Sequence, residues 1–107
     1  SRGLGDVYKR QEFTQGKKLM IIEDPTRGID ISAVSYIWKR ILRLAESGIA
    51  ILLISHELSE LKELSDRILV MYNGRLLEPE NSTALSEEEL GLWMTGGKAK
   101  GEEKGEQ

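Results

Sequence analysis

The 107-residue sequence contains no cysteine, two prolines and a single histidine. Without cysteine the chain forms no disulfide, which fits a reducing compartment. No apolar run approaches the roughly 20 residues that a membrane span requires, and no secretory signal is visible. Any contact with a membrane is therefore expected to go through another polypeptide.

Basic residues are scarce as well, with 15 lysines and arginines against 18 aspartates and glutamates. The formal net charge of −3 gives no basic excess that would mark a nucleic-acid surface, so no nucleic-acid partner is expected. An apolar fraction of 39% still permits a core, and the length suffices for one small domain.

The stretch 19–30 organises the rest of the prediction. Leu19–Ile22 is apolar at every position, which is typical of a strand buried on both faces in a parallel sheet covered by helices. Glu23 and Asp24 follow at the carboxyl end of this strand, where open α/β sheets bind ligands. Paired carboxylates there suit Mg²⁺ and a phosphate ester. The alternative is a solvated turn before Pro25.

A helix and a second strand are expected next. Apolar residues recur at helical spacing over 34–45, after an N-cap at Asp30 or Ser32, and Gly48 fits the position just beyond the helix. Ala50–Ile54 is again apolar throughout. Strand, helix and strand in this order predict a parallel pair with a right-handed crossover.

His56 directly follows the second strand. In a parallel sheet neighbouring carboxyl ends share an edge, so His56 is expected on the same rim as Glu23 and Asp24. The alternative is a partly exposed histidine that flanks a helix start. His56-Glu57 also begins like the His-Glu-x-x-His helix of metalloproteases, but Glu60 stands where the second histidine would be, and a zinc site is set aside.

The remainder predicts a short helix over 55–64 and a third strand over Ile68–Tyr72. Asn73-Gly74 separates that strand by two residues from Arg75–Leu77, which indicates an antiparallel hairpin.

A last helix is expected to end at Met94. Ser86 with Glu89 forms a capping box at its start. Leu90, Trp93 and Met94 are expected to pack on the body of the domain. Trp38, on the apolar stripe of the first helix, is interpreted as a core residue and not as a base-stacking one.

These motifs, in this order, resemble the ATP-binding cassette (ABC) ATPases. The stretch 19–30 resembles the Walker B strand and D-loop, and Pro25–Asp30 is similar to the second of two fused cassettes in importers for simple sugars and nucleosides. Ile51–Leu58 resembles the H-loop, and Leu64–Arg75 resembles the sheet that follows it. The resemblance covers Lys18–Gly97. It implies an α/β, partial P-loop NTPase fold: a mostly parallel sheet with flanking helices and a terminal antiparallel hairpin.

The resemblance also assigns roles to four side chains. Glu23 stands at the position of the acid that holds Mg²⁺, and Asp24 at that of the catalytic base. The family order is Asp then Glu, so the two acids are reversed here. Since a misplacement of about 1 Å can cost about a hundredfold in rate, weak or absent hydrolysis is expected. His56 corresponds to the switch histidine at the γ-phosphate, and Asp30 to the D-loop acid at the dimer interface, a role compatible with N-capping.

Two family motifs do not occur in this sequence. It contains no Gly-x-x-x-x-Gly-Lys-Ser/Thr loop and no Leu-Ser-Gly-Gly-Gln-type signature, both of which lie upstream in the family. ATP and Mg²⁺ are therefore expected to need an N-terminal portion that this chain lacks. The predicted organisation is a non-native or disordered segment over 1–11, the C-terminal portion of an ABC ATPase domain over 12–97, and a disordered tail over 98–107.

The resemblance implies a part of the ATP-binding and ATP-hydrolysing subunit of an ABC importer for nucleosides or simple sugars. Membrane permease subunits and an N-terminal cassette or second ATPase subunit are the expected partners, at the cytoplasmic face of the plasma membrane. The reversed acids favour an alternative, a degenerate, non-hydrolysing cassette with a structural or regulatory role. A third hypothesis, an ABC protein acting on ribosomes or DNA, predicts a basic surface that the net charge does not supply.

Overall fold

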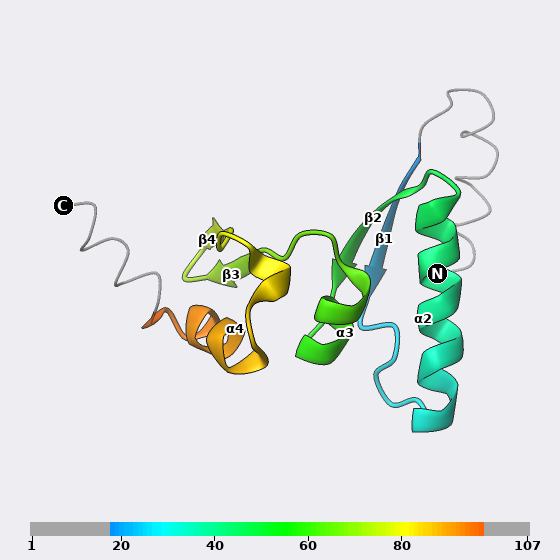
Figure 1. The fold of residues 1–107 in the computed structure, drawn as a ribbon, viewed down its shortest axis with the longest axis horizontal. Coiled ribbons are helices and arrows are strands. Elements are labelled where there is room, and N and C mark those ends of the chain that lie inside the picture. The colour runs from blue at the N-terminus through cyan, green and yellow to red at the C-terminus, as the bar shows by residue number, and fades with distance from the viewer. Residues whose placement is uncertain (1–17, 98–107) are drawn as a thin grey trace. The chain divides into compact units, whose positions relative to one another are not determined.

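The computed structural model describes residues 18–97, which divide into two compact units between Glu60 and Leu61 (Figure 1). The segments 1–11 and 98–107, for which the sequence predicts disorder, lie outside the described residues. Within residues 18–97, no helix combines the length and the apolar character needed to cross a membrane.

The first unit is a β-α-β arrangement. Strands β1 (Leu19–Glu23) and β2 (Ala50–Ile54) pair in parallel, with Glu23 opposite Ile54. Helix α2 (Ile31–Glu46) connects them and runs antiparallel to both strands (Figure 1). The predicted parallel pair with a helical connection is confirmed.

Helix α2 begins and ends where local sequence predicts. Asp30 is its N-cap residue, although the Asp30 side chain accepts no capping hydrogen bond. Beyond the C-cap residue Ser47, Gly48 adopts a φ of +103°, a conformation that glycine reaches without steric cost. The Gly48 amide donates to the carbonyl of Ala45 at 3.0 Å, which satisfies one carbonyl of the last turn.

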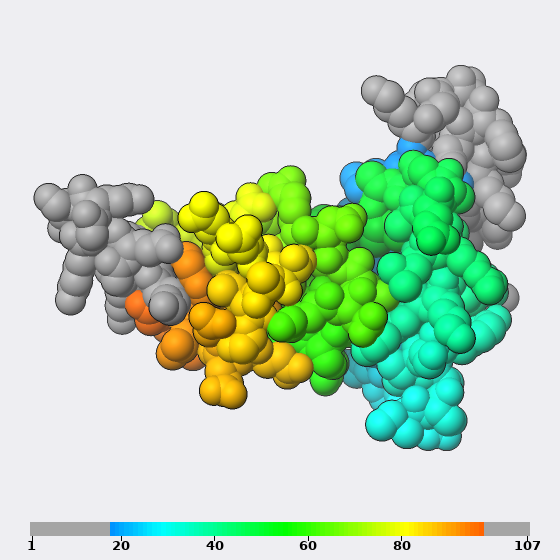
Figure 2. All heavy atoms as spheres, viewed as in Figure 1, coloured from blue at the N-terminus to red at the C-terminus, as the bar shows by residue number. Residues whose placement is uncertain are grey.

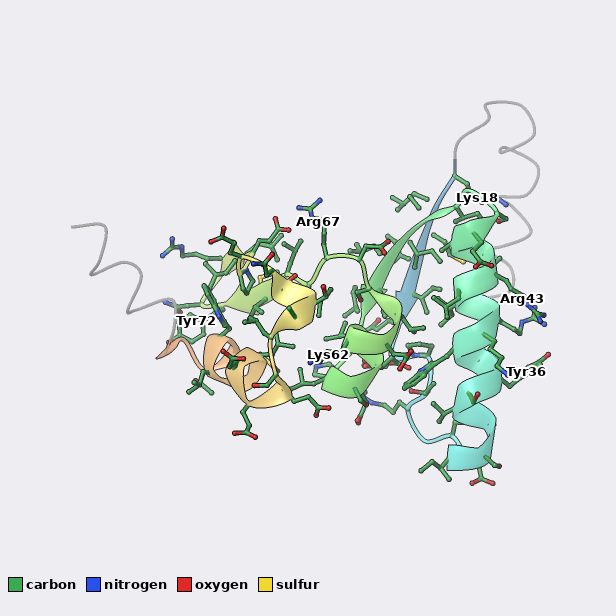
Figure 3. All side chains as sticks on the ribbon, viewed as in Figure 1. Lys18, Tyr36, Arg43, Lys62, Arg67 and Tyr72 are labelled. Atoms are coloured by element: carbon green, nitrogen blue, oxygen red, sulfur yellow. The ribbon has the colours of Figure 1, made fainter. Side chains whose placement is uncertain are left out.

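The outer face of α2 is polar and aromatic. Tyr36 and Arg43 point away from the strands (Figure 3), and Arg40 donates to the Tyr36 hydroxyl at 3.2 Å. Figure 2 shows the atoms of α2, coloured cyan to green, as a ridge on the visible side of this unit. Ile41, on the inner side, is buried.

Only one face of the β1 and β2 pair is covered by the described residues. Leu19, Ile21, Leu52 and Ile54, which alternate along the strands, are between 42% and 50% exposed. Their neighbours on the other face are half-buried. The prediction of strands buried on both faces is therefore wrong for residues 18–97, because successive side chains point to opposite faces and only one face meets other described residues.

Helix α3 (Leu58–Leu64) is shorter than predicted and contains the boundary between the two units. The chain bends at His56 before this helix, and the Ser55 hydroxyl accepts the Glu57 amide at 3.0 Å. This side chain offers the backbone an alternative to helical hydrogen bonding, which delays the helix start.

The second unit contains the predicted hairpin. Strands β3 (Val70–Tyr72) and β4 (Arg75–Leu77) pair antiparallel around Asn73 and Gly74, which have φ values of +51° and +76°. Positive φ at both turn residues is what a two-residue hairpin requires. Strand β3 begins two residues later than predicted, and the strands of residues 18–97 form two separate two-stranded sheets.

Side-chain hydrogen bonds stabilise residues 67–68, which precede β3. The guanidinium of Arg67 donates to both carboxylate oxygens of Glu78, each at 2.7 Å. The buried amide of Ile68 donates to the Ser82 hydroxyl at 2.8 Å. Ile68 is thus buried and satisfied without belonging to the strand.

The last helix, α4 (Glu87–Met94), follows the short 3₁₀ helix η1 (Ser82–Ala84). The predicted capping box is confirmed: the Glu89 amide donates to the Ser86 hydroxyl at 3.0 Å, and the Ser86 amide donates to the Glu89 carboxylate at 2.9 Å. Reciprocal bonds of this kind fix the start of α4.

The core of the second unit forms between α4 and the hairpin. Val70 and Trp93 are buried together, with Leu77 and Leu85 packed against them. Leu90 and Trp93 are buried as predicted, whereas Met94 is 43% exposed, so the packing expected of Met94 is wrong. The helix presents Trp93 inward, and this orientation carries the adjacent residue toward solvent.

Gly96, just past α4, packs against the ring of Tyr72 and has a φ of +85°. We predict that Gly96→Ala lowers the free energy of unfolding by about 1–3 kcal/mol, because a Cβ there would overlap the ring and the backbone would be strained. Gly74→Ala is the matched control, since Gly74 shares the positive φ but has open space around it. Thermal unfolding that shows equal losses for the two variants would contradict the packing of Tyr72 on Gly96.

Candidate functional site

The register of β1 and β2 brings their carboxyl ends to one edge. Glu23 ends β1 opposite Ile54, which ends β2, so Asp24 and Ser55 leave the sheet side by side. The Asp24 amide donates to the carbonyl of Ile54 at 2.7 Å and extends the ladder by one bond. The residue after Ser55 is His56.

Asp24 and His56 are hydrogen-bonded to each other at this edge. One Asp24 carboxylate oxygen accepts the backbone amide of His56 at 3.0 Å. The Nδ1 atom of the His56 ring lies 3.2 Å from both carboxylate oxygens. The structure thus brings together two of the four residues singled out from the sequence, on the rim where they are expected.

Backbone geometry aims the Asp24 carboxylate at His56. Asp24 has a φ of +41°, a left-handed conformation that aspartate tolerates better than most residues. The Arg27 amide donates to the Asp24 carbonyl at 3.2 Å, and the Ile29 amide to the Thr26 carbonyl at 3.3 Å. The chain therefore turns tightly as it leaves β1, and the side chain of Asp24 points back toward β2.

Arg27 adds a positive charge beside the pair. Its guanidinium lies 3.4 Å from the Asp24 carboxylate and 3.5 Å from His56 Nδ1. When Nδ1 carries the proton that binds Asp24, the guanidinium acts as a neighbouring charge and not as a donor to the ring. The Asp24 side chain is 10% exposed, whereas those of Arg27 and His56 are 70% and 68% exposed.

The pKa of Asp24 lies below its usual range. The hydrogen bond from the His56 ring is the main cause, and burial opposes it by raising the pKa. The His56 backbone amide and the Arg27 charge lower the pKa further. All of these favourable contacts stabilise the ionised carboxylate, so Asp24 is an anion at neutral pH.

This arrangement fixes which nitrogen of His56 is available for chemistry. Because Nδ1 faces the carboxylate, Nε2 is the nitrogen left for a substrate or a water molecule. In the neutral ring Nε2 accepts a proton, and in the charged ring it donates a hydrogen bond to an anion. The pair can therefore serve a water molecule or a phosphate oxygen.

Glu23 and Asp30 do not join this cluster. Glu23 is exposed at the end of β1, and the Asp30 carboxylate accepts the Ser32 hydroxyl at 3.2 Å at the start of α2. Among the described residues, no group of three or more potential ligands is arranged to hold a metal ion. Glu23 can supply one carboxylate oxygen to Mg²⁺, which commonly takes one or two carboxylates together with waters and substrate phosphates.

Glu60 is the polar residue of this unit that the sequence analysis missed. It is 1% exposed, and its carboxylate accepts hydrogen bonds from Thr26, Trp38 and Ser55. Trp38, interpreted from the sequence as a core residue, is half-buried, and its indole nitrogen donates to this acid at 2.8 Å. The available signal in the sequence is weak: an acid lying among leucines in a short helix.

The lowered pKa of Asp24 predicts how stability depends on pH. A carboxylate whose pKa is depressed in the folded state contributes stability above its unfolded pKa, near 3.9, and loses this contribution as the pH falls through the folded value. We expect the difference in unfolding free energy between the wild type and Asp24→Asn to shrink as the pH falls below about 4. Urea unfolding at several pH values measures it, and a constant difference would refute the ion-stabilising contacts.

The comparisons with known proteins gave matches in one of three collections. No family model matches the chain, and no solved structure gives a significant match. Among curated proteins, the chain is 40% identical over 86 residues to the guanosine import ATP-binding protein NupO of Bacillus subtilis, covering 80% of this chain and 17% of that protein.

Two further relatives agree with this match. The nucleoside import ATP-binding protein NupA of Lactococcus lactis is 40% identical over 90 residues, covering 81% of this chain and 17% of NupA. The xylose import ATP-binding protein XylG of Geobacillus kaustophilus is 44% identical over 81 residues, covering 76% of this chain and 16% of XylG. The chain spans about one sixth of the length of these relatives. With homology extending over about four fifths of its own residues, this chain matches a fragment of an ATP-binding protein of the ABC importers for nucleosides and sugars.

Proposed function

We propose that this chain is part of the ATP-binding and ATP-hydrolysing subunit of an ABC importer for nucleosides or simple sugars. The observation that carries the proposal is the hydrogen-bonded pair of Asp24 and His56 at the carboxyl edge of two parallel strands. That edge is the usual ligand-binding edge of an open α/β sheet. The relatives named for import of guanosine, nucleosides and xylose support the class of cargo.

In this proposal Asp24 and His56 act on the water that attacks the γ-phosphate. Asp24 holds the imidazole through Nδ1, so Nε2 would be the nitrogen available to a nucleotide. A ring fixed in this way can accept a proton from water, or donate a hydrogen bond to the phosphate oxygen as negative charge develops there. Asp24 stabilises the imidazolium in either case, because its carboxylate remains ionised.

Glu23 and Asp30 take supporting roles. When bound, ATP with Mg²⁺ supplies the phosphoryl group and the positive charge that neutralises it. Glu23, exposed at the end of β1, would hold Mg²⁺ through one carboxylate oxygen. Asp30, the N-cap residue of α2, would contact a second nucleotide site across a dimer interface.

The partners follow from the same proposal. This sequence contains no phosphate-binding loop, so another segment would cradle the triphosphate. An N-terminal cassette or a second ATPase subunit would be a partner. Membrane permease subunits would bind this protein at the cytoplasmic face of the plasma membrane and couple ATP hydrolysis to transport.

One observation favours the alternative, a non-hydrolysing cassette. Both carboxylate oxygens of Asp24 are occupied by His56, and one of them also faces Arg27. Asp24 is in addition one methylene shorter than the glutamate usual at this position. A carboxylate that is short and already engaged is poorly placed to reach an attacking water, so the nucleotide would then act as a structural clamp.

The order of the two acids decides between these functions. We predict that Glu23→Asp combined with Asp24→Glu raises ATP turnover of the intact subunit about tenfold to a hundredfold, because each carboxylate moves by about one methylene toward its required place. Steady-state hydrolysis by the intact transporter measures the effect. Each single substitution is the control, and an unchanged rate in the double variant would show that the order is not limiting.

The isolated chain tests the dependence on another segment. We predict no ATP binding by the 107-residue chain at micromolar concentrations, because a carboxylate pair without a phosphate-binding loop lacks most of the positive potential that holds a triphosphate. Titration calorimetry with Mg²⁺ present measures it. Micromolar binding would mean that these residues recognise nucleotide unaided.

A further inference from the structure

We infer that Glu60 is a positioning residue that sets the placement of His56 against Asp24, by tying the loop after β1 to the end of β2. The inference rests on the proposed function only for the reaction that the pair performs. The tie itself is independent of any nucleotide.

The Glu60 carboxylate joins three separate segments of the first unit. Its Oε2 accepts the Thr26 hydroxyl at 2.6 Å and the Trp38 indole nitrogen at 2.8 Å. Its Oε1 accepts the Ser55 hydroxyl at 2.7 Å. Thr26 lies in the loop after β1, Trp38 in α2, and Ser55 directly after β2.

This acid is fully buried, which makes its three bonds significant. A carboxylate removed from water is strongly unfavourable unless hydrogen bonds replace its hydration. An indole N–H can only donate, so the Trp38 bond fixes Oε2 as an acceptor. A leucine at this position in α3 would bury apolar area and would need no hydrogen bonds. The three donors around Glu60 therefore indicate a site for a hydrogen-bond acceptor.

Two of these hydrogen bonds involve residues close to Asp24 and His56. Thr26 is two residues beyond Asp24, and Ser55 immediately precedes His56. The Ser55 hydroxyl also accepts the Glu57 amide at 3.0 Å, so the residues on both sides of His56 are held. One carboxylate therefore restrains both chain segments whose separation determines the contact between Asp24 and His56.

A consequence concerns the loop 24–30, which carries Asp30 to the start of α2. If that loop shifts, the Thr26 bond transmits the shift through Glu60 to Ser55 and so to His56. A purely structural Glu60 would instead serve only to satisfy Trp38 and hold α2 in place. The two possibilities differ in whether His56 responds when the carboxylate is changed.

The chain contains its own reporters for this test. His56 is the single histidine, and Trp38 and Trp93 are the only tryptophans. In proton–nitrogen NMR spectra of the 107-residue chain, the Trp38 indole signal reports the bond to Glu60, the His56 ring signal reports the pair, and the Trp93 indole signal reports the fold of the second unit.

We expect Glu60→Gln to shift the Trp38 and His56 signals and to leave the Trp93 signal in place. An amide offers one acceptor oxygen where the carboxylate offers two, so it cannot accept donors on both sides. A shift of Trp38 without any shift of His56 would overturn the proposal, because Glu60 would then hold only α2.

Two matched variants test the Thr26 and Trp38 hydrogen bonds separately. They also keep the proposal testable if the amide of Glu60→Gln accepts all three hydrogen bonds as the carboxylate does. Thr26→Val keeps the shape of the side chain but removes its donor, and it should shift the His56 signal. Trp38→Phe removes a donor to the same Glu60 oxygen, but Trp38 lies in α2 and not beside Asp24 or His56. This variant should therefore leave the His56 signal unshifted. Equal responses to both variants, or no response to Thr26→Val, would reduce Glu60 to a structural residue.

Turnover provides the second readout in the intact subunit. Thr26→Val should lower kcat on the order of tenfold with KM unchanged, whereas Trp38→Phe should leave both unchanged. A subunit that hydrolyses no ATP in any form would refute the proposed function, yet the NMR shifts would still decide the role of Glu60. A rise in KM with constant kcat for Thr26→Val would contradict positioning.

Discussion

The first unit depends on the in-register parallel pairing of β1 with β2. Because Glu23 lies opposite Ile54, the next residues on each strand meet, and the carboxylate of Asp24 reaches His56. A slip by one residue would send alternate side chains to the opposite face and separate the pair. The register is in turn continued by the bond from the Asp24 amide to the Ile54 carbonyl, which joins the ladder to the site.

Features with a local physical cause could be predicted from the sequence. The end of α2 at Gly48, the turn at Asn73-Gly74 and the capping box of α4 each follow from residues close in the chain. Features that depend on distant segments could not. Glu60 is held by residues 34, 22 and 5 positions away, and no short-range pattern reveals such a set of contacts. The burial of β1 and β2 likewise does not follow from their own residues, because an unbroken apolar run does not show which segments cover each face.

The electrostatics of the site favour a fixed pair over two independent groups. Asp24 is nearly buried and ionised, and the exposed His56 ring is oriented by it. In this arrangement the Asp24 carboxylate is hydrogen-bonded to Nδ1, and Nε2 of the exposed ring remains available. Under the proposed function, it suits a role in which the histidine contacts a phosphate oxygen. The relatives are about six times as long as this chain.

The pairing of Asp24 with His56 can be measured directly on the isotope-labelled 107-residue chain through nuclear Overhauser contacts. The account predicts cross-peaks from the Asp24 β-protons to the His56 amide proton, together with strand contacts that align Glu23 with Ile54. Strand contacts in another register, with no cross-peak between Asp24 and His56, would contradict it.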